Sequence, residues 1–72
     1  MHHAVMRTHA QIVNEAGVDA VAADRNVSIH TVRSWKQRNS IPAEHWNGFV
    51  RNQWAAFEEL AKAAEQRLER AA

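Results

Sequence analysis

The chain has 72 residues, enough for one domain, and a monomer of this size is marginally stable because it buries only roughly 60% of its unfolded surface. It has no cysteine, which excludes disulfides and thiolate-bound metals. The net charge is +1. No secretory signal pattern and no run of about 18 apolar residues occurs in the sequence. We therefore expect a cytoplasmic, nucleoid-associated protein with no membrane partner. With 2 Gly and 1 Pro in a chain that is 46% hydrophobic, the composition predicts an all-α, compact bundle of four to five helices.

Residues 1–7 are predicted to form an N-terminal arm that precedes the first helix. Thr8 and Gln11 then fit a capping box, T-x-x-Q, in which each side chain bonds to the backbone N–H of the other residue. Gly17 suits the position just after a helix C-terminus. These signals predict a first helix over residues 9–16.

Two short helices are predicted next, over residues 18–25 and 29–38. Asp19 is favourable in the first turn of the earlier helix, and Asn26 ends it because asparagine tolerates the left-handed conformation. Ser28 is an N-cap for the later helix, and Asn39 suits the position after its C-terminus.

A fourth helix is predicted over residues 42–51, since Pro42 suits an early helical position. Its apolar face includes Trp46 and Phe49, and Gly48 is expected where backbones pack closely. Asn52 is expected to cap a last helix over residues 53–70. One continuous helix through both segments is the alternative.

The last segment, residues 52–72, carries apolar residues at alternating intervals of three and four, a short heptad seam. We expect this C-terminal helix to form the interface of a homodimer, and the alternative is that it folds back on its own core. The predicted dimerisation residues are Trp54, Phe57, Ala61, Ala64 and Leu68.

Residues 18–38 carry a pattern of small, turn, capping and buried positions, namely Ala22, Asn26, Val27, Ser28, Val32 and Trp35. This pattern resembles the helix-turn-helix of Cro-like and phage-repressor regulators. The resemblance covers about residues 8 to 50, and we assign residues 8–51 to a helix-turn-helix DNA-binding domain. Asn26 replaces the usual glycine of the turn. Arg25 replaces a leucine, which implies either a thinner core or a side chain that reaches out to a phosphate.

The predicted recognition helix runs from Ser28 to Arg38, with Val32 and Trp35 turned to the core. Its opposite side has no acid and bears groups that read base edges: arginine pairs with guanine, glutamine with adenine, and isoleucine touches the thymine methyl. The predicted base-reading residues are Ile29, His30, Arg33, Ser34 and Gln37. Ser28, Lys36 and Arg38 are expected beside phosphates.

The charge distribution agrees with this interpretation, because residues 25–51 carry five basic side chains against one acidic side chain, a net charge of +4. We therefore expect a transcriptional regulator, acting as a repressor, that binds double-stranded DNA without a cofactor or small-molecule ligand. The alternative is a module of the same fold, similar to an antitoxin, whose main partner is a protein.

An enzyme is not expected, because a glycine-rich phosphate loop and a His-x-x-x-His pair are both missing from the sequence. The start Met1-His2-His3 has the geometry for chelating copper or nickel through a free N-terminus, but no acid or thiolate complements it, so no metal site is expected. His45 is expected on the surface of the fourth helix.

Overall fold

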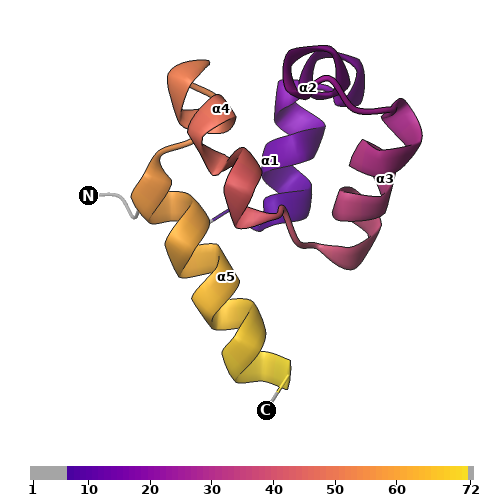
Figure 1. The fold of residues 1–72 in the computed structure, drawn as a ribbon. Coiled ribbons are helices and arrows are strands. Elements are labelled where there is room, and N and C mark those ends of the chain that lie inside the picture. Colours follow the sequence, from indigo (N-terminus) through magenta and orange to yellow (C-terminus); the bar gives the residue numbers. More distant parts are fainter. Residues whose placement is uncertain (1–6, 72) are drawn as a thin grey trace.

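Helices form the whole architecture of the part of the chain that the structure describes. The structure is a computed structural model, which describes the backbone of residues 7–71 and the side chains of residues 7–66. In this part the elements are α1 (His9–Ala16), α2 (Val18–Arg25), α3 (Ile29–Arg38), the 3-10 helix η1 (Ala43–His45), α4 (Trp46–Arg51) and α5 (Phe57–Ala71), with no strand (Figure 1). The predicted all-α bundle is therefore confirmed. None of these helices has the length and apolar character needed to cross a membrane.

The first helix begins and ends where its local signals predict. The Thr8 hydroxyl accepts from the Gln11 backbone N at 3.2 Å, and the Thr8 backbone N donates to Gln11 Oε1 at 2.8 Å, so the capping box is complete. Gly17 follows with φ 97°, a conformation that L side chains rarely adopt. Both bounds of α1 are confirmed.

Two asparagines in the left-handed region end the next two helices. Asn26 has φ 57° after α2, and Asn39 has φ 56° after α3. Between them, the hydroxyl of Ser28 accepts from the backbone N of Thr31 at 3.0 Å and caps α3. The predicted bounds of α2 and α3 are therefore confirmed, and an asparagine directly follows each of the two helices.

The second half of the chain departs from prediction. Pro42 precedes η1 rather than opening α4, and the last helix begins at Phe57 rather than Gln53. Gln53 instead has φ 60°, and the chain turns over residues 52–56. In this turn the backbone N of Trp54 donates to the Phe49 carbonyl at 2.9 Å, and Ala55 enters the core. Helices α4 and α5 are therefore separate, and the continuous alternative is wrong.

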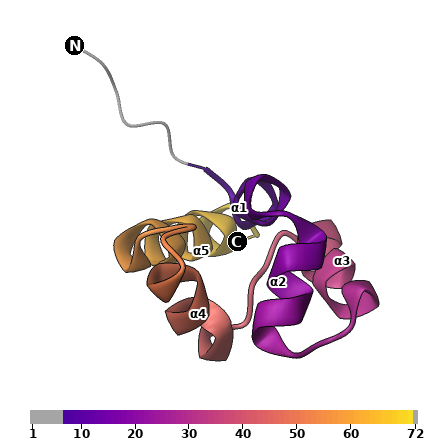
Figure 2. The same ribbon diagram turned by 90° about the horizontal axis from the view of Figure 1, so that it is seen from above.

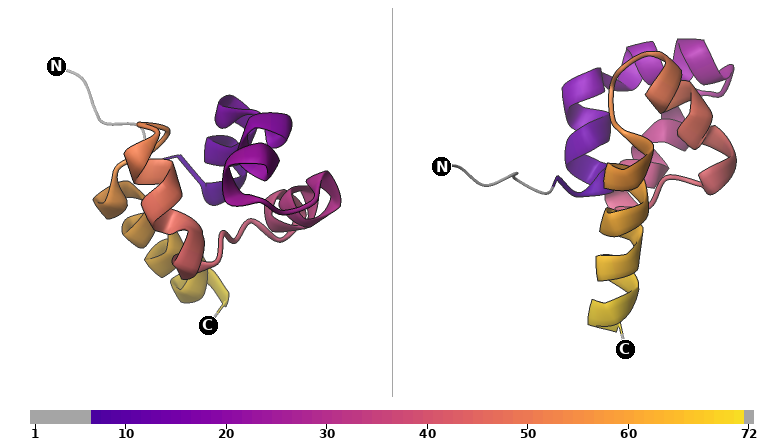
Figure 3. Two further views of the ribbon diagram at one scale, coloured as in Figure 1. Left: turned by 45° about the horizontal axis from the view of Figure 1, so that its top comes forward. Right: turned by 90° about the vertical axis from the view of Figure 1, so that its left-hand side faces the viewer.

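The core is built around α1, which packs against α2, α3 and α5 (Figure 2). Its buried apolar side chains are Ile12, Val13, Val21, Ala22, Val32, Trp35, Ile41, Phe49, Ala55 and Leu60. Leu60 of α5 is fully buried, so the first half of this helix folds onto the core of its own chain. The second half of α5 extends away from the other helices (Figure 3).

Two polar side chains connect the start of α1 to α5. The ring of His9 is buried, its Nδ1 accepts from the Ile41 backbone N at 2.9 Å, and its Nε2 lies 2.8 Å from the Leu60 carbonyl. Arg7 makes a bidentate ion pair with Glu59, with Nε to Oε2 at 2.6 Å and Nη2 to Oε1 at 2.7 Å. Arg7 is the one residue of the predicted N-terminal arm that is described, since residues 1–6, with His2 and His3, lie outside the described part.

Candidate nucleic-acid interface

Helix α3 lies at the edge of the molecule, on the opposite side of α1 from α5 (Figures 1 and 2). It packs against α1 and α2, with Val32 fully buried and Trp35 3% exposed. The prediction that these two side chains belong to the core is confirmed. Because they anchor one side of α3, the rest of the helix surface is left to face outward.

The outward side of α3 brings together four of the predicted base-reading residues. Ile29 is 41% exposed, and His30, Arg33 and Gln37 are exposed as well. Ser34 is half-buried. Among residues 7–66, no acidic side chain forms an ion pair with any of these groups. The surface therefore presents an exposed methyl-bearing side chain beside an unpaired guanidinium and an amide.

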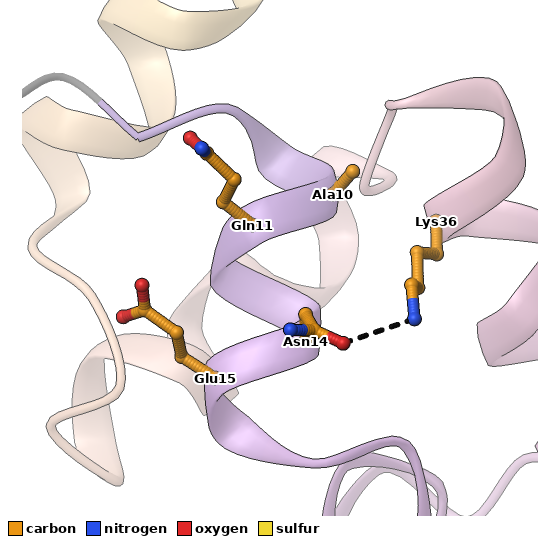
Figure 4. Close-up of a pocket in the computed structure, with 5 residues that line it drawn as sticks. All are labelled: Ala10, Gln11, Asn14, Glu15 and Lys36. Carbon is orange, nitrogen blue, oxygen red and sulfur yellow. Dashed lines mark hydrogen bonds between the residues drawn. The ribbon is translucent and has the colours of Figure 1, made fainter.

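The three residues predicted beside phosphates are in different situations. Arg38 is exposed at the C-terminus of α3. Ser28 is exposed too, but its hydroxyl is engaged in capping, 3.0 Å from the backbone N and 3.0 Å from the hydroxyl of Thr31. Lys36 is half-buried on the flank of α3 that faces α1, and its Nζ donates to Asn14 Oδ1 at 3.0 Å (Figure 4).

A shallow, open depression runs between α1 and α3. One part is lined by Ala10, Val18, Arg33, Lys36 and Gln37. The adjoining part is lined by Ala10, Gln11, Asn14, Glu15 and Lys36 (Figure 4). The sequence does not indicate a place for α1 here, because an exposed asparagine on an amphipathic helix looks like any other solvated polar residue until the neighbouring helix is in place.

The side chain of Arg25 lies against α4. Its side chain is 20% exposed, and its guanidinium lies across the backbone of Gly48 in α4. The Nη1 atom is 3.8 Å from Asp24 Oδ2, and Nε is buried without a hydrogen-bond partner among the described residues. Gly48 is buried, and the group that approaches it most closely is this side chain rather than the predicted second backbone.

The prediction that His45 is a surface residue is wrong. Its side chain is 17% exposed, and its ring centroid lies 4.7 Å from that of Trp35. The residue sits in η1, directly before α4, and the chain folds this segment against the core side of α3. His45 therefore packs against the buried side of α3 through Trp35.

The predicted dimer seam is only partly helical. Trp54 lies in the turn before α5 and is half-buried, with its ring centroid 5.5 Å from that of Phe49, so it does not continue a helical heptad. Phe57 is 56% exposed, and Ala61 and Ala64 are half-buried. The side chain of Leu68 lies outside the described residues.

No group of three metal-ligating side chains gathers within the described residues. Comparisons with protein-family models, with curated proteins and with solved structures found no match. The resemblance to Cro-like regulators therefore rests on the motif residues of this chain.

Proposed function

We propose that the chain is a sequence-specific, double-stranded-DNA-binding transcriptional regulator that inserts α3 into the major groove. The observation that carries this proposal is the outward side of α3, where Ile29, His30, Arg33 and Gln37 are exposed together and unpaired with acids in the described part. The major groove is about 12 Å wide and admits an α-helix. The anchoring of α3 through Val32 and Trp35 leaves this side free to enter it.

Each side chain has a role that follows from its chemistry. The Arg33 guanidinium pairs with O6 and N7 of a guanine, and the Gln37 amide pairs with an adenine. Ile29 contacts a thymine methyl group. Lys36 and Arg38, on the flanks of this surface, neutralise backbone phosphates and set the register of the helix. Binding near a promoter then acts by occupancy, which is the mechanism of a repressor.

Selection of bound duplexes from a random pool tests the proposal. We expect an enriched half-site, and we expect Arg33→Ala to lose about 1–3 kcal/mol of binding and to relax the preference at one base pair. The exposed Arg51 on α4 offers a matched control, because Arg51→Ala removes the same charge away from α3. Affinity must also fall steeply with salt. No enrichment, or a flat salt dependence, would contradict the proposal.

The proposal includes a homodimer formed through the part of α5 that its own core leaves uncovered. Phe57 is 56% exposed, and the half-buried Ala61 and Ala64 follow it on the same helix. Dimers of this motif place their recognition helices one DNA turn apart, about 34–36 Å. The same selection examines this point: two half-sites at that spacing support the dimer, and a single half-site contradicts it.

A protein-binding module is the second candidate, because Phe57 and Val50, which is 38% exposed, are large apolar side chains on the surface. A module of this kind has no need of the unpaired cations on α3. Incubation with genomic DNA fragments separates the two functions, since a protein-binding module enriches no sequence.

A further inference from the structure

Two polar side chains, one on α1 and one on the flank of α3 that faces it, are joined across the two helices. Lys36 Nζ donates to Asn14 Oδ1 at 3.0 Å, a contact between residues 22 apart in the chain (Figure 4). Asn14 is exposed and Lys36 is half-buried, so the pair lies at the surface, along the depression between the two helices. The ammonium group is thereby held at the edge of α3.

This contact leaves a cluster that consists of donors. A lysine ammonium has three N–H donors, one of which goes to Asn14, and an asparagine amide nitrogen has two. Among the described residues, no acceptor takes the amide nitrogen of Asn14 or the other donors of Lys36. The oxygen of Asn14, the only acceptor of the two side chains, already accepts from Lys36. Such a cluster suits an oxyanion.

The acidic side chain that lines the depression is turned away from this cluster. Glu15 lines the same depression, but its Oε1 lies 2.6 Å from Arg7 Nη1. Figure 4 shows the Glu15 carboxylate on the other side of α1 from Lys36. Arg7 therefore neutralises the carboxylate that lines this depression, and the cluster stays positive.

The position of the cluster indicates which anion it takes. The depression continues along α3 to Arg33 and Gln37, the side chains proposed to read bases. When a helix lies in the major groove, the phosphates of the groove wall run beside its flanks. We propose that Asn14 and Lys36 form a clamp for one backbone phosphate of duplex DNA, so that α1 takes part in the interface. This inference rests on the function proposed above.

The substitution Asn14→Asp tests the clamp, because it replaces the amide donors with a carboxylate that pairs with Lys36 and repels a phosphate. Measured on the selected duplex and on a scrambled one, affinity is expected to fall about tenfold on both. The slope of log affinity against log salt concentration is expected to decrease in magnitude by about 0.9, the value for one phosphate contact. In a Lys36→Gln background, Asn14→Asp should leave the slope unchanged.

Gln11→Glu is the matched control, because it adds the same charge to α1 from a side chain that extends away from Lys36 (Figure 4). Glutamate also preserves the capping box with Thr8. If the wild type binds DNA but Asn14→Asp and Gln11→Glu give the same slope of log affinity against log salt concentration, the clamp is refuted and the proposed function is not. Wild-type protein that binds no duplex overturns the proposed function and the clamp together. Unfolding curves of the variants show that each remains folded.

Discussion

At the scale of single residues, His9 is the polar group on which the packing of three segments depends. Its Nδ1 accepts from the Ile41 backbone N, so Nε2 carries the proton that goes to the Leu60 carbonyl, and one neutral ring satisfies both groups. The ring also meets Trp46 edge to face, with centroids 5.8 Å apart. His9 therefore connects α1 to the segment after α3 and to α5.

Replacing His9 should destabilise the fold. His9→Ala leaves the Ile41 N–H without its partner, which costs about 1–3 kcal/mol for a buried polar group, and it also removes a buried ring that packs against Trp46. We expect a loss of at least about 2 kcal/mol in the free energy of unfolding, measured by denaturant titration. The exposed His30 is the control, where His30→Ala should change stability by less than about 0.5 kcal/mol. Equal effects of the two substitutions would refute this role of His9.

At the scale of elements, α2 and α4 meet through an arginine laid across a glycine. A Cβ added at Gly48 would lie 1.9 Å from Arg25 Nη1 and 2.8 Å from Arg25 Cζ, so the guanidinium has to move if residue 48 gains a side chain. A long cation here packs against the smallest residue. The fit explains why a glycine occurs inside a short helix, where it is otherwise unfavourable.

The two residues should therefore be coupled. Gly48→Ala in the wild type is expected to cost about 1 kcal/mol, because the end of the flexible Arg25 side chain has to move. In an Arg25→Ala background most of this cost should disappear, because the space is then open. A double-mutant cycle measured by thermal unfolding gives the coupling, expected to be about 1 kcal/mol. Asn47→Ala, at the exposed neighbouring position, is the control, and additive effects of the Arg25 and Gly48 changes would argue against the contact.

At the scale of the whole molecule, Arg7 joins the start of the described chain to the turn before α5 and to the first turn of α5. It bonds to Glu59 of α5, to Glu15 of α1 and, through Nη2, to the Trp54 carbonyl at 3.1 Å. The hydrogen bonds from Arg7 keep the pKa of Glu59 below its ordinary value of 4.5, against the opposing effect of burial. They also raise the pKa of Arg7, which stays charged at every accessible pH.

The lowered pKa of Glu59 predicts an acid-dependent loss of stability. The unfolded chain takes up this proton more readily than the folded one, so the contribution is present above pH 4.5 and is lost as pH falls through the lower folded value. Glu59→Gln should therefore differ most from wild type near neutral pH and converge with it in acid, measured by urea unfolding from pH 7 to pH 2.5. Glu58→Gln, at the exposed neighbouring position, should show a small and constant difference. A Glu59→Gln difference that does not change with pH would contradict the ion pair.

The sequence by itself determined the bounds of α1, α2 and α3, and which side of α3 is buried. The reason is that these signals are local. Thr8 and Ser28 cap the backbone N–H groups of the helix that follows each of them, and Asn26 ends the helix before it. The spacing of Val32 and Trp35 places both on one side of a helix. Signals of this range are readable without any knowledge of the rest of the fold.

Only the tertiary structure decided the turn before α5, the burial of Leu60 and the contact between Asn14 and Lys36. The turn forms because Trp54 and Ala55 gain contacts with the core, whereas the intrinsic preferences of residues 52–56 do not exclude a helix. Likewise, His9 is buried by partners 32 and 51 residues away in the chain. Such contacts depend on how the helices are oriented to one another, and no residue-by-residue preference carries that information.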